Sequence, residues 1–455
     1  MSQTYDLTNG NYKTQILKFF FPMFLTNMLQ QIYTIADTAI VGKGLGDNPL
    51  AAVGNMSSLT FLIIGFSIGL TNGFTIKTAQ FFGAGNQEHL KHSIASAIIL
   101  SAWITIILTV ISMTFLRTIL VKLQTPELII SDSLTYGYII FGGLFVNIAY
   151  NLCASILRAL GDSKTPFYAI VVSTVINIIF DYGAVFILKS GVEGPAIVTV
   201  AAQLISAVIC LRKLRKIDII RLTPEDFKKN RQMMMELLQN GIPMALMNSI
   251  TAIGCMIVQY FVNGMGVIYT SAYSACSKYI NLFMQPACTA GNTMSSFTSQ
   301  NYGAKRYDRI VGGLRVCLTI ALISYIILGS VMICFSKELA GFMLNGTKQI
   351  DLASQYLINC GFMIFAVDFL FIFRSGCQGM GKPMIPMISG ILEMTFRIFV
   401  IAAFSGIVGF PATSYAEIAA WIGALSLNTF AFIHYIRKET TLTCHVGSDT
   451  VRQGI

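Results

Sequence analysis

A five-residue sequence ending in Gly-Ala occurs twice in the chain. Residues 80–84 read QFFGA at the end of one long apolar segment, and residues 300–304 read QNYGA at the end of another. The same offset of 220 residues relates Gly161 to Gly381, each of which follows a later apolar segment. Self-similarity at a fixed offset indicates a duplicated unit. The 455 residues are therefore predicted to form two related halves.

Long apolar segments lie on both sides of these two sequences and fill both halves of the chain. Charged residues are only 11% of the chain, apolar types reach 54%, and the mean hydropathy is +0.67. Such a chain has too little polar surface to face water on all sides, and a membrane-spanning helix needs about 20 apolar residues. Twelve spans are predicted, at about 15–41, 50–80, 92–116, 132–157, 166–188, 194–211, 233–262, 267–300, 310–335, 351–377, 383–405 and 414–436.

The expected fold class is an all-α integral membrane protein with twelve transmembrane helices in two six-helix lobes. Because six is an even number, both halves enter the membrane from the same side and form a parallel internal repeat. The predicted domains are an N-terminal lobe (1–211), a cytoplasmic linker (212–232), a C-terminal lobe (233–436) and a cytoplasmic tail (437–455). Within the linker, the run TPED at residues 223–226 predicts a helix start.

The distribution of basic residues predicts the orientation. With both termini inside, 21 of the 31 Lys and Arg residues lie in inner segments and 6 lie in outer loops. Lys and Arg accumulate on the cytoplasmic side of membrane proteins, so the chain is expected in the cell membrane with both termini cytoplasmic. The same distribution accounts for the net charge of +10 without a nucleic-acid partner.

Four polar residues are buried in predicted spans of the first half. Asp37 lies deep in the first span, and Asn177 and Asp181 lie four residues apart on one face of the fifth span. Thr199 lies early in the sixth span. Intramembrane acids commonly mark ion pathways, and burial beside a second carboxylate favours binding of a proton, while the oxygen atoms also suit sodium. The alternative is a structural role, in which these side chains hold helices together by hydrogen bonds.

The second half carries another set of intramembrane charges. Asp368 lies in the middle of the tenth span, and Glu393 and Arg397 lie four residues apart in the eleventh. A mutually neutralising ion pair is the favoured interpretation of Glu393 and Arg397, ahead of coupling or substrate binding. Asp368 has no charged neighbour on its own helix. Lys278 and Arg374 are expected to extend their charged ends toward the membrane surface.

Motifs of enzyme chemistry are absent from the sequence. No P-loop GxxxxGK[ST], HExxH or GxSxG occurs, and no Cys/His spacing indicates a metal site. The chain is therefore expected not to be an enzyme. It is expected to need no cofactor beyond a coupling ion, H⁺ or Na⁺, and to hold no metal other than a sodium ion at the coupling site.

Several features together resemble the multidrug and toxic compound extrusion (MATE) family of secondary transporters. The resemblance rests on the order of Pro22, Asp37, GAGN at 83–86, LRALGDSKTP at 157–166 and GMGKP at 379–383. It covers roughly residues 15–436 and implies export of organic cations or hydrophobic drugs by alternating access, in exchange for protons or sodium.

The resemblance also implies roles for individual residues. Asp37, Asn177, Asp181 and Thr199 fall where one branch of the family keeps an ion-coupling site, and Asp368 falls where other members have an acid tied to cation coupling. The expected partners are cationic amphipathic small molecules and the lipid bilayer, and the expected state is a monomer. A flippase for a lipid-linked or other amphipathic precursor remains the alternative function.

Overall fold

The computed structural model describes residues 6–123, 125–228 and 230–452. These residues form two compact helical units. Unit 1 contains Lys18–Ala245, and unit 2 combines Leu7–Leu17 with the chain from Leu246 onward. The predicted all-α class is confirmed. The last residues of the predicted tail, 453–455, lie outside the described residues.

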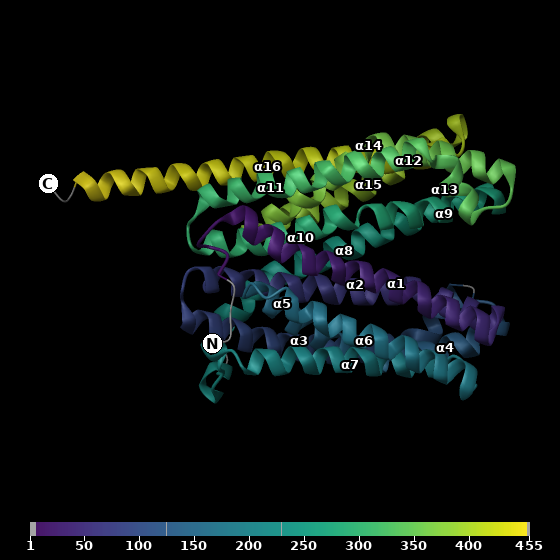
Figure 1. The fold of residues 1–455 in the computed structure, drawn as a ribbon, viewed down its shortest axis with the longest axis horizontal. Helices are drawn as coiled ribbons and strands as arrows, with labels where there is room; N and C mark the ends of the chain where they lie inside the picture. The colour runs from purple at the N-terminus through teal and green to yellow at the C-terminus, as the bar shows by residue number, and fades with distance from the viewer. Residues whose placement is uncertain (1–5, 124, 229, 453–455) are drawn as a thin grey trace. The chain divides into compact units, whose positions relative to one another are not determined.

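The first half of the chain supplies most of unit 1 (Figure 1). Its helices are α1 (Tyr12–Leu45), α2 (Asp47–Gly83), α3 (Gln87–Lys122), α4 (Glu127–Gly142), α5 (Leu144–Ala159), α6 (Lys164–Tyr182) and α7 (Glu193–Arg215). The short elements are a π-helical turn, η1 (Gly183–Ile187), and two 3₁₀ turns, η2 (Asp218–Ile220) and η3 (Pro224–Phe227).

The second half begins with α8 (Arg231–Met265), whose first part belongs to unit 1. Unit 2 then contains α9 (Val267–Phe283), α10 (Gln285–Gly303), α11 (Tyr307–Ser324), the π-helical turn η4 (Tyr325–Gly329), α12 (Ser330–Cys334), α13 (Ser336–Met343), α14 (Thr347–Gly379), α15 (Met384–Val408) and α16 (Pro411–Arg452). Helix α13 was not predicted, because eight residues between two spans carry no spanning-length apolar signal.

Nine helices of the described residues are long and apolar enough to cross a membrane, and the pair α4–α5, bent by 44°, brings the number to ten. The two remaining predicted spans, 15–41 and 267–300, correspond to α1 and to the α9–α10 pair. Both are helical, and the second is divided between α9, of 17 residues, and α10, of 19 residues and rich in polar side chains. Each predicted apolar segment thus corresponds to a helix or to a broken helix.

The backbone confirms the duplication at the turns. Residues with positive φ recur at an offset of 220, in the pairs Gly46/Gly266, Gly85/Lys305, Gly161/Gly381 and Lys189/Gly409. Each pair lies where one helix ends and the next begins, a position that favours the left-handed conformation available to glycine. The two halves therefore reverse direction with the same local geometry.

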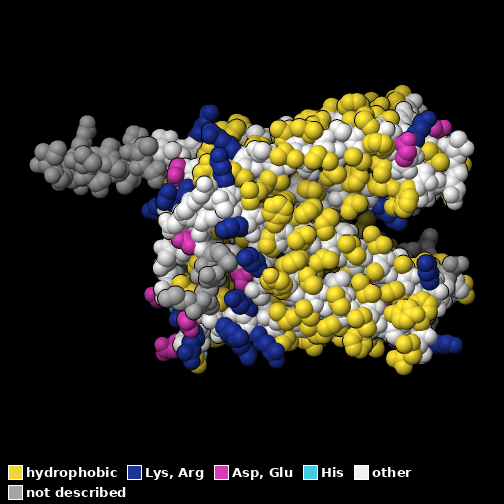
Figure 2. Space-filling view, in the orientation of Figure 1, with side chains coloured by type: hydrophobic (Ala, Val, Ile, Leu, Met, Phe, Trp, Pro, Cys, Tyr) yellow, Lys and Arg dark blue, Asp and Glu magenta, His cyan; other side chains and the backbone are white. Residues whose placement is uncertain are grey.

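Each unit has its own apolar core. In unit 1, α5 packs against α2 and α7, and α6 packs against α7. In unit 2, α14 packs against α10 and α16, and α15 packs against α16. Hydrophobic side chains cover the length of the helices, while Lys and Arg side chains gather at helix ends (Figure 2). This distribution matches the requirement that lipid-facing surface be apolar and that basic residues lie near headgroups.

The segment before α1 is bound to unit 2 by polar contacts. The Arg309 guanidinium donates hydrogen bonds to the carbonyl oxygens of Leu7 (3.0 Å) and Gly10 (2.7 Å) and to Asn301 Oδ1 (3.0 Å). The Leu7 amide donates to Gln300 Oε1 at 2.9 Å. The first turns of α1 therefore belong to unit 2 and the rest of α1 belongs to unit 1. Helix α8 passes in the opposite sense, from unit 1 to unit 2, after Ala245.

The predicted helix start in the linker is confirmed, and it opens a short helical element. The Thr223 amide donates to Asp226 Oδ2 at 2.7 Å, and the Asp226 amide donates to the Thr223 carbonyl at 3.1 Å. The turn that follows is a 3₁₀ element of four residues, and α8 begins only at Arg231.

Candidate functional site

Two acids from different helices meet in unit 1. Asp37 lies on α1 and Asp181 lies near the end of α6, and their carboxyl groups are close enough to interact electrostatically. Asp181 is completely buried, and Asp37 is partly buried. Sequence analysis placed both acids within spans. Their contact across 144 residues of sequence is supplied by the fold.

Three of the four carboxyl oxygens of this pair lack a hydrogen-bond donor among the described residues. Among the described residues, no donor reaches hydrogen-bonding geometry with Asp37 Oδ1 or with either oxygen of Asp181. The Asn177 side chain lies beside the Asp181 carboxyl, yet its own amide atoms are also without a partner. A buried polar group without a partner is costly, so this set of oxygen atoms has unused capacity to bind a proton or a cation.

Two tyrosines lie close to the acid pair. The hydroxyls of Tyr33 and Thr199 are 3.1 Å apart and join α1 to α7. Tyr33 on α1 and Tyr136 on α4 both interact electrostatically with Asp37. The acidic cluster of unit 1 therefore consists of Tyr33, Asp37, Tyr136, Asn177, Asp181 and Thr199.

The two tyrosines were not predicted. Tyr33 precedes Asp37 by four residues, so helical spacing placed it on the same face and could have identified it. No local pattern marks Tyr136, because its contact with the acids depends on how α4 packs against the other helices.

Local geometry holds the helices of the acidic cluster in place. The π-helical turn Gly183–Ile187 begins two residues after Asp181, and such turns are frequent at functional sites. Ser206 on α7 donates a hydrogen bond to the Ala169 carbonyl of α6 at 3.1 Å. Gly44 at the end of α1 lies so close to η1 that an added Cβ would be 2.0 Å from Val185 Cγ1. These contacts fix α1, α6 and α7 around the acids.

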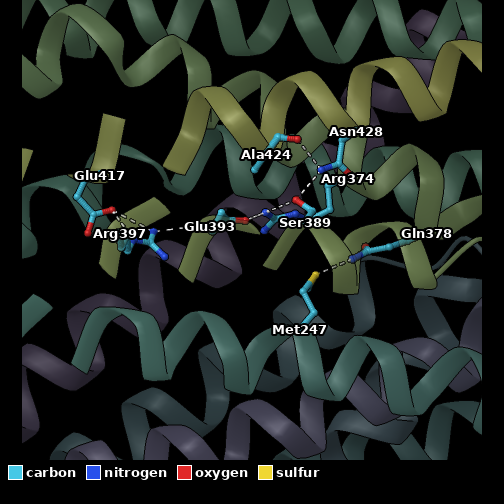
Figure 3. A network of polar contacts seen from close by, with 9 residues as sticks. All are labelled: Met247, Arg374, Gln378, Ser389, Glu393, Arg397, Glu417, Ala424 and Asn428. Atoms are coloured by element: carbon cyan, nitrogen blue, oxygen red, sulfur yellow. Dashed lines mark hydrogen bonds and ion pairs between the residues drawn. The ribbon is translucent and has the colours of Figure 1, made fainter. Parts of the chain in front are cut away.

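Unit 2 contains a chain of four buried charges (Figure 3). Glu393 forms a close ion pair with Arg374 and lies 3.7 Å from Arg397 Nη2. Arg397 in turn pairs with Glu417, at 3.0 Å from Nη2 and 3.1 Å from Nε. This unit 2 ion-pair chain, Arg374–Glu393–Arg397–Glu417, joins α14, α15 and α16. Two positive and two negative charges make it formally neutral.

The predicted contact between Glu393 and Arg397 is confirmed, and two other charges must be added to it. The expectation that Arg374 extends to the membrane surface is wrong, because its side chain is only 8% exposed and is paired with Glu393. Glu417 was not identified, although a single acid inside the twelfth span signals a buried partner. Ser389 and Asn428 extend the network, with Asn428 Nδ2 donating to Ser389 Oγ at 2.7 Å.

Asp368 is separate from the ion-pair chain. It lies on α14 and is 1% exposed, and no ion pair involves it within the part of the chain that the structure describes. Its Oδ1 atom has no hydrogen-bond partner there. The structure thus divides the three predicted residues of the second half into one isolated acid and one paired couple, Glu393 and Arg397.

The donor set at the acidic cluster suits a hard monovalent ion or a proton better than a transition metal. No group of three His, Cys, Asp or Glu side chains able to hold a metal ion occurs among the described residues. The side chains around Asp37 and Asp181 offer carboxyl, amide and hydroxyl oxygens, which are the ligand types preferred by hard cations.

Long apolar helices in two matched halves define a membrane transporter of the duplicated helical class. The MatE family model matches residues 22–183 and again residues 243–402, so its two matches begin 221 residues apart. The chain belongs to the MatE family, and the predicted resemblance to MATE transporters is confirmed.

Curated relatives cover most of the chain. The chain is 30% identical over 351 residues to “Probable multidrug resistance protein YoeA” of Bacillus subtilis (strain 168), covering 75% of each. It is 22% identical to “Probable multidrug resistance protein NorM” of Thermotoga maritima, covering 91% of this chain and 89% of that protein. It is 20% identical to the “FAD transporter” of Shewanella oneidensis, covering 82% and 83%.

Solved structures match the whole fold. “Crystal structure of MATE in the bent conformation” superposes with a TM-score of 0.91 at 19% identity, covering 98% of this chain and 100% of that chain. “Outward-facing conformation of a multidrug resistance MATE family transporter of the MOP superfamily” gives a TM-score of 0.90 at 18% identity, covering 97% and 99%. These likenesses confirm the twelve-helix membrane fold.

Proposed function

We propose that this transporter is a cation-coupled antiporter that exports organic cations or hydrophobic drugs by alternating access. The observation that carries the proposal is the closeness of Asp37 and Asp181, three of whose carboxyl oxygens have no donor among the described residues. Two adjacent carboxyl groups repel when both are ionised, so binding of a proton or a sodium ion between them is favourable. In this role Asn177 and Thr199 supply further oxygen atoms.

Ion loading would then bias the conformation. A bound proton or cation removes the repulsion between Asp37 and Asp181 and allows α1 to stay against α6 and α7. Release of the ion restores the repulsion and favours another arrangement of these helices. A ligand shifts a conformational equilibrium only by its difference in affinity for the two states, and neutralising a buried acid pair supplies such a difference.

The substrate class rests on two kinds of support. Relatives are named for multidrug resistance or multidrug export, and the acidic cluster places negative charge within a span. The acid pair can attract a cationic substrate only after its coupling ion has left. This alternation suits the export of a cation in exchange for the ion. Another relative is named an FAD transporter, so related chains are assigned different cargo. A flippase for a lipid-linked or other amphipathic precursor is the alternative for this chain.

The charges of unit 2 receive separate roles in the proposal. Asp368, buried and outside any described ion pair, is a second candidate for ion coupling or substrate binding. Glu393 and Arg397 are proposed to be structural, because each lies between two oppositely charged groups of a neutral chain. Removing one member leaves an uncompensated buried charge, and this strongly destabilises the folded protein.

The topology and organisation are part of the proposal. Both termini and the linker 212–232 are cytoplasmic, with lobes 1–211 and 233–436 and a tail 437–455. The chain works as a monomer in the cell membrane, with no enzyme activity and no cofactor beyond H⁺ or Na⁺. Its cytoplasmic face carries most of the Lys and Arg residues.

Uptake of a fluorescent organic cation into inverted membrane vesicles tests the function. Proton and sodium gradients are imposed one at a time, with the membrane potential clamped. Exchange of one proton for one monovalent cation moves no net charge, so a chemical gradient alone should drive uptake. Uptake driven by either gradient supports antiport and names the ion. No uptake with any gradient, together with translocation of a labelled amphipathic lipid precursor, would favour the flippase.

A further inference from the structure

An apolar groove lies in unit 1 between α1 and α6, beside the acidic cluster. Its volume is about 620 Å³. The walls include Ala36, Ala39 and Ile40 of α1 together with Ile179, Tyr182 and Phe186 of α6 and η1. Small residues of α1 make room between the two helices.

The walls of this α1–α6 groove are surface residues rather than core. Ile179 is 62% exposed and Tyr182 is 55% exposed. Both belong to a stretch, Lys164–Ile187, that is long and apolar enough to cross a membrane. An exposed apolar surface on a spanning helix is covered by lipid hydrocarbon, because water is excluded from that region. An acyl chain is therefore a suitable occupant of the groove.

One cation lines the groove. Lys43 lies in the last turn of α1 and has no ion-pair partner among the side chains that the structure describes. The next residue, Gly44, packs closely on Val185 and Phe186, so α1 approaches η1 beside Lys43. Tyr182 provides an amphipathic aromatic ring in the same groove, a residue type enriched at membrane interfaces.

We propose that the α1–α6 groove is a binding site for an anionic phospholipid, with one acyl chain between α1 and α6 and the phosphate-bearing headgroup on Lys43. Lipid tails are as apolar as the helix surfaces they touch, so tail packing gives little preference for one lipid over another. Charge attraction to Lys43 supplies the preference for an anionic headgroup.

The groove shares its helices with the acid pair. Ala36 precedes Asp37, and Tyr182 follows Asp181, so a chain in the groove lies along the residues that carry both acids. A lipid held between α1 and α6 resists any change in their separation. Bound anionic lipid therefore shifts the ion dependence of transport. This last step rests on the proposed ion coupling, whereas binding of the lipid does not.

Lipid-dependent thermal stability of the purified full-length chain in detergent tests the binding. Phosphatidylglycerol is the anionic probe, and phosphatidylcholine is the zwitterionic probe. Phosphatidylglycerol is expected to stabilise the native chain at lower concentration. Lys43→Gln should weaken its apparent affinity about five-fold, the effect of losing one basic residue at a membrane surface. Lys122→Gln, at the end of α3, is the matched control and should leave the affinity unchanged.

A second variant tests the groove itself. Ala39 is exposed, so Ala39→Trp is expected to fold and to fill the groove. It should abolish stabilisation by phosphatidylglycerol while leaving the elution profile of the native chain. Equal effects of the two lipids on the native chain, or full phosphatidylglycerol affinity in Lys43→Gln or Ala39→Trp, would overturn the proposal. A different result would assign the groove to substrate: a fluorescent organic cation displaces the lipid competitively, and Ala39→Trp binds neither the cation nor the lipid.

The consequence for transport is measured separately. In proteoliposomes, replacing phosphatidylcholine by phosphatidylglycerol should change the ion concentration for half-maximal uptake in the native chain, and this change should disappear in Lys43→Gln. Loss of all ion-driven uptake in both lipids would contradict the proposed antiport without affecting the binding result. Lipid binding without any change in ion dependence would overturn the coupling step alone.

Discussion

Gly85 and Lys305 occupy equivalent turns of the two halves, and both have positive φ, at 70° and 57°. In the first half this conformation costs glycine nothing, whereas in the second half a lysine adopts it with its Cβ strained against the backbone. We expect Lys305→Gly to stabilise the chain by about 1 kcal/mol, which corresponds to a rise in Tm of about 2 °C. Thermal unfolding of the purified protein measures it.

Lys305→Ala is the control for this substitution, because it removes the charge and keeps the Cβ. It should not raise the Tm. A similar rise in Lys305→Ala and Lys305→Gly would show that charge, not backbone conformation, limits stability at this turn.

The acid pair gives the most direct prediction about transport. Asp37→Asn and Asp181→Asn each remove a charge from a pair without described donors, so both variants should insert and fold. Gradient-driven uptake should fall to the level of vesicles without the transporter, while binding of the fluorescent cation should lose its dependence on pH or sodium. Asp351→Asn, on an exposed acid near Lys337, is the matched control. Normal coupled transport by either acid variant would remove that acid from the mechanism.

The hydroxyl contact between Tyr33 and Thr199 gives a graded prediction. Thr199→Val removes one partner of a 3.1 Å hydrogen bond beside the acids. A net hydrogen bond is worth about 1 kcal/mol, so the apparent ion affinity should weaken about five-fold while maximal transport changes little. Thr34→Val is the control, because the Thr34 hydroxyl donates to the Gln30 carbonyl of its own helix. Equal shifts in both variants would contradict a specific role for Thr199.

The unit 2 ion-pair chain revises a prediction drawn from the sequence alone. From the i, i+4 spacing, joint neutralisation of Glu393 and Arg397 is expected to be better tolerated than either single change. The structure revises this, because that double variant leaves Arg374 and Glu417 without partners. Arg397→Met with Glu417→Gln leaves the Arg374–Glu393 pair intact and should be the more stable double variant.

The single substitutions set the scale for this comparison. Breaking a buried pair by removing one partner typically costs about 3–5 kcal/mol, so Arg397→Met and Glu393→Gln should both reduce the yield of folded protein. Denaturation midpoints of the singles and the two doubles form the measurement. Full stability and transport in both singles would show that the chain is not structural.

Orientation is tested by labelling from outside the cell. In a cysteine-free variant, single cysteines replace Asn48, in a predicted outer turn, and Glu225, in the linker. Glu225 is chosen rather than Asp226, because the Asp226 carboxylate accepts a hydrogen bond from the Thr223 amide and its replacement would disturb the cap. An impermeant thiol reagent should label position 48 in intact cells and position 225 only after lysis. The reverse pattern would invert the proposed topology.

Sequence reasoning succeeded where the information is periodic or repeated. The offset relating Gly161 to Gly381 predicted a duplication that the turn conformations confirm. Asp37 and Asp181 were identified because a charge in an apolar run is visible without knowing the fold. Their contact was not deducible, because it depends on the packing of α1 against α6.

The misses have a common physical cause. Glu417 lies 20 residues from Arg397, and Arg374 lies 19 residues from Glu393, so no spacing on one helix connects them. Arg374 lies near a predicted helix end, so its side chain is expected at the membrane surface. At such a position the sequence does not distinguish an arginine that reaches the surface from one in a buried ion pair. Tyr136 faces the acids only through the placement of α4.

The contact between Arg309 and Leu7 joins residues 302 positions apart and sets an order of events during synthesis. The amino terminus leaves the ribosome first, but the side chain that binds it is made only after the eighth predicted span is complete. Until then the first turns of α1 have no docking partner, although the rest of α1 can already join unit 1. Neither half of the gene therefore encodes one whole unit. A chain released between the repeats lacks Arg309, so the segment before α1 has no residue to bind it.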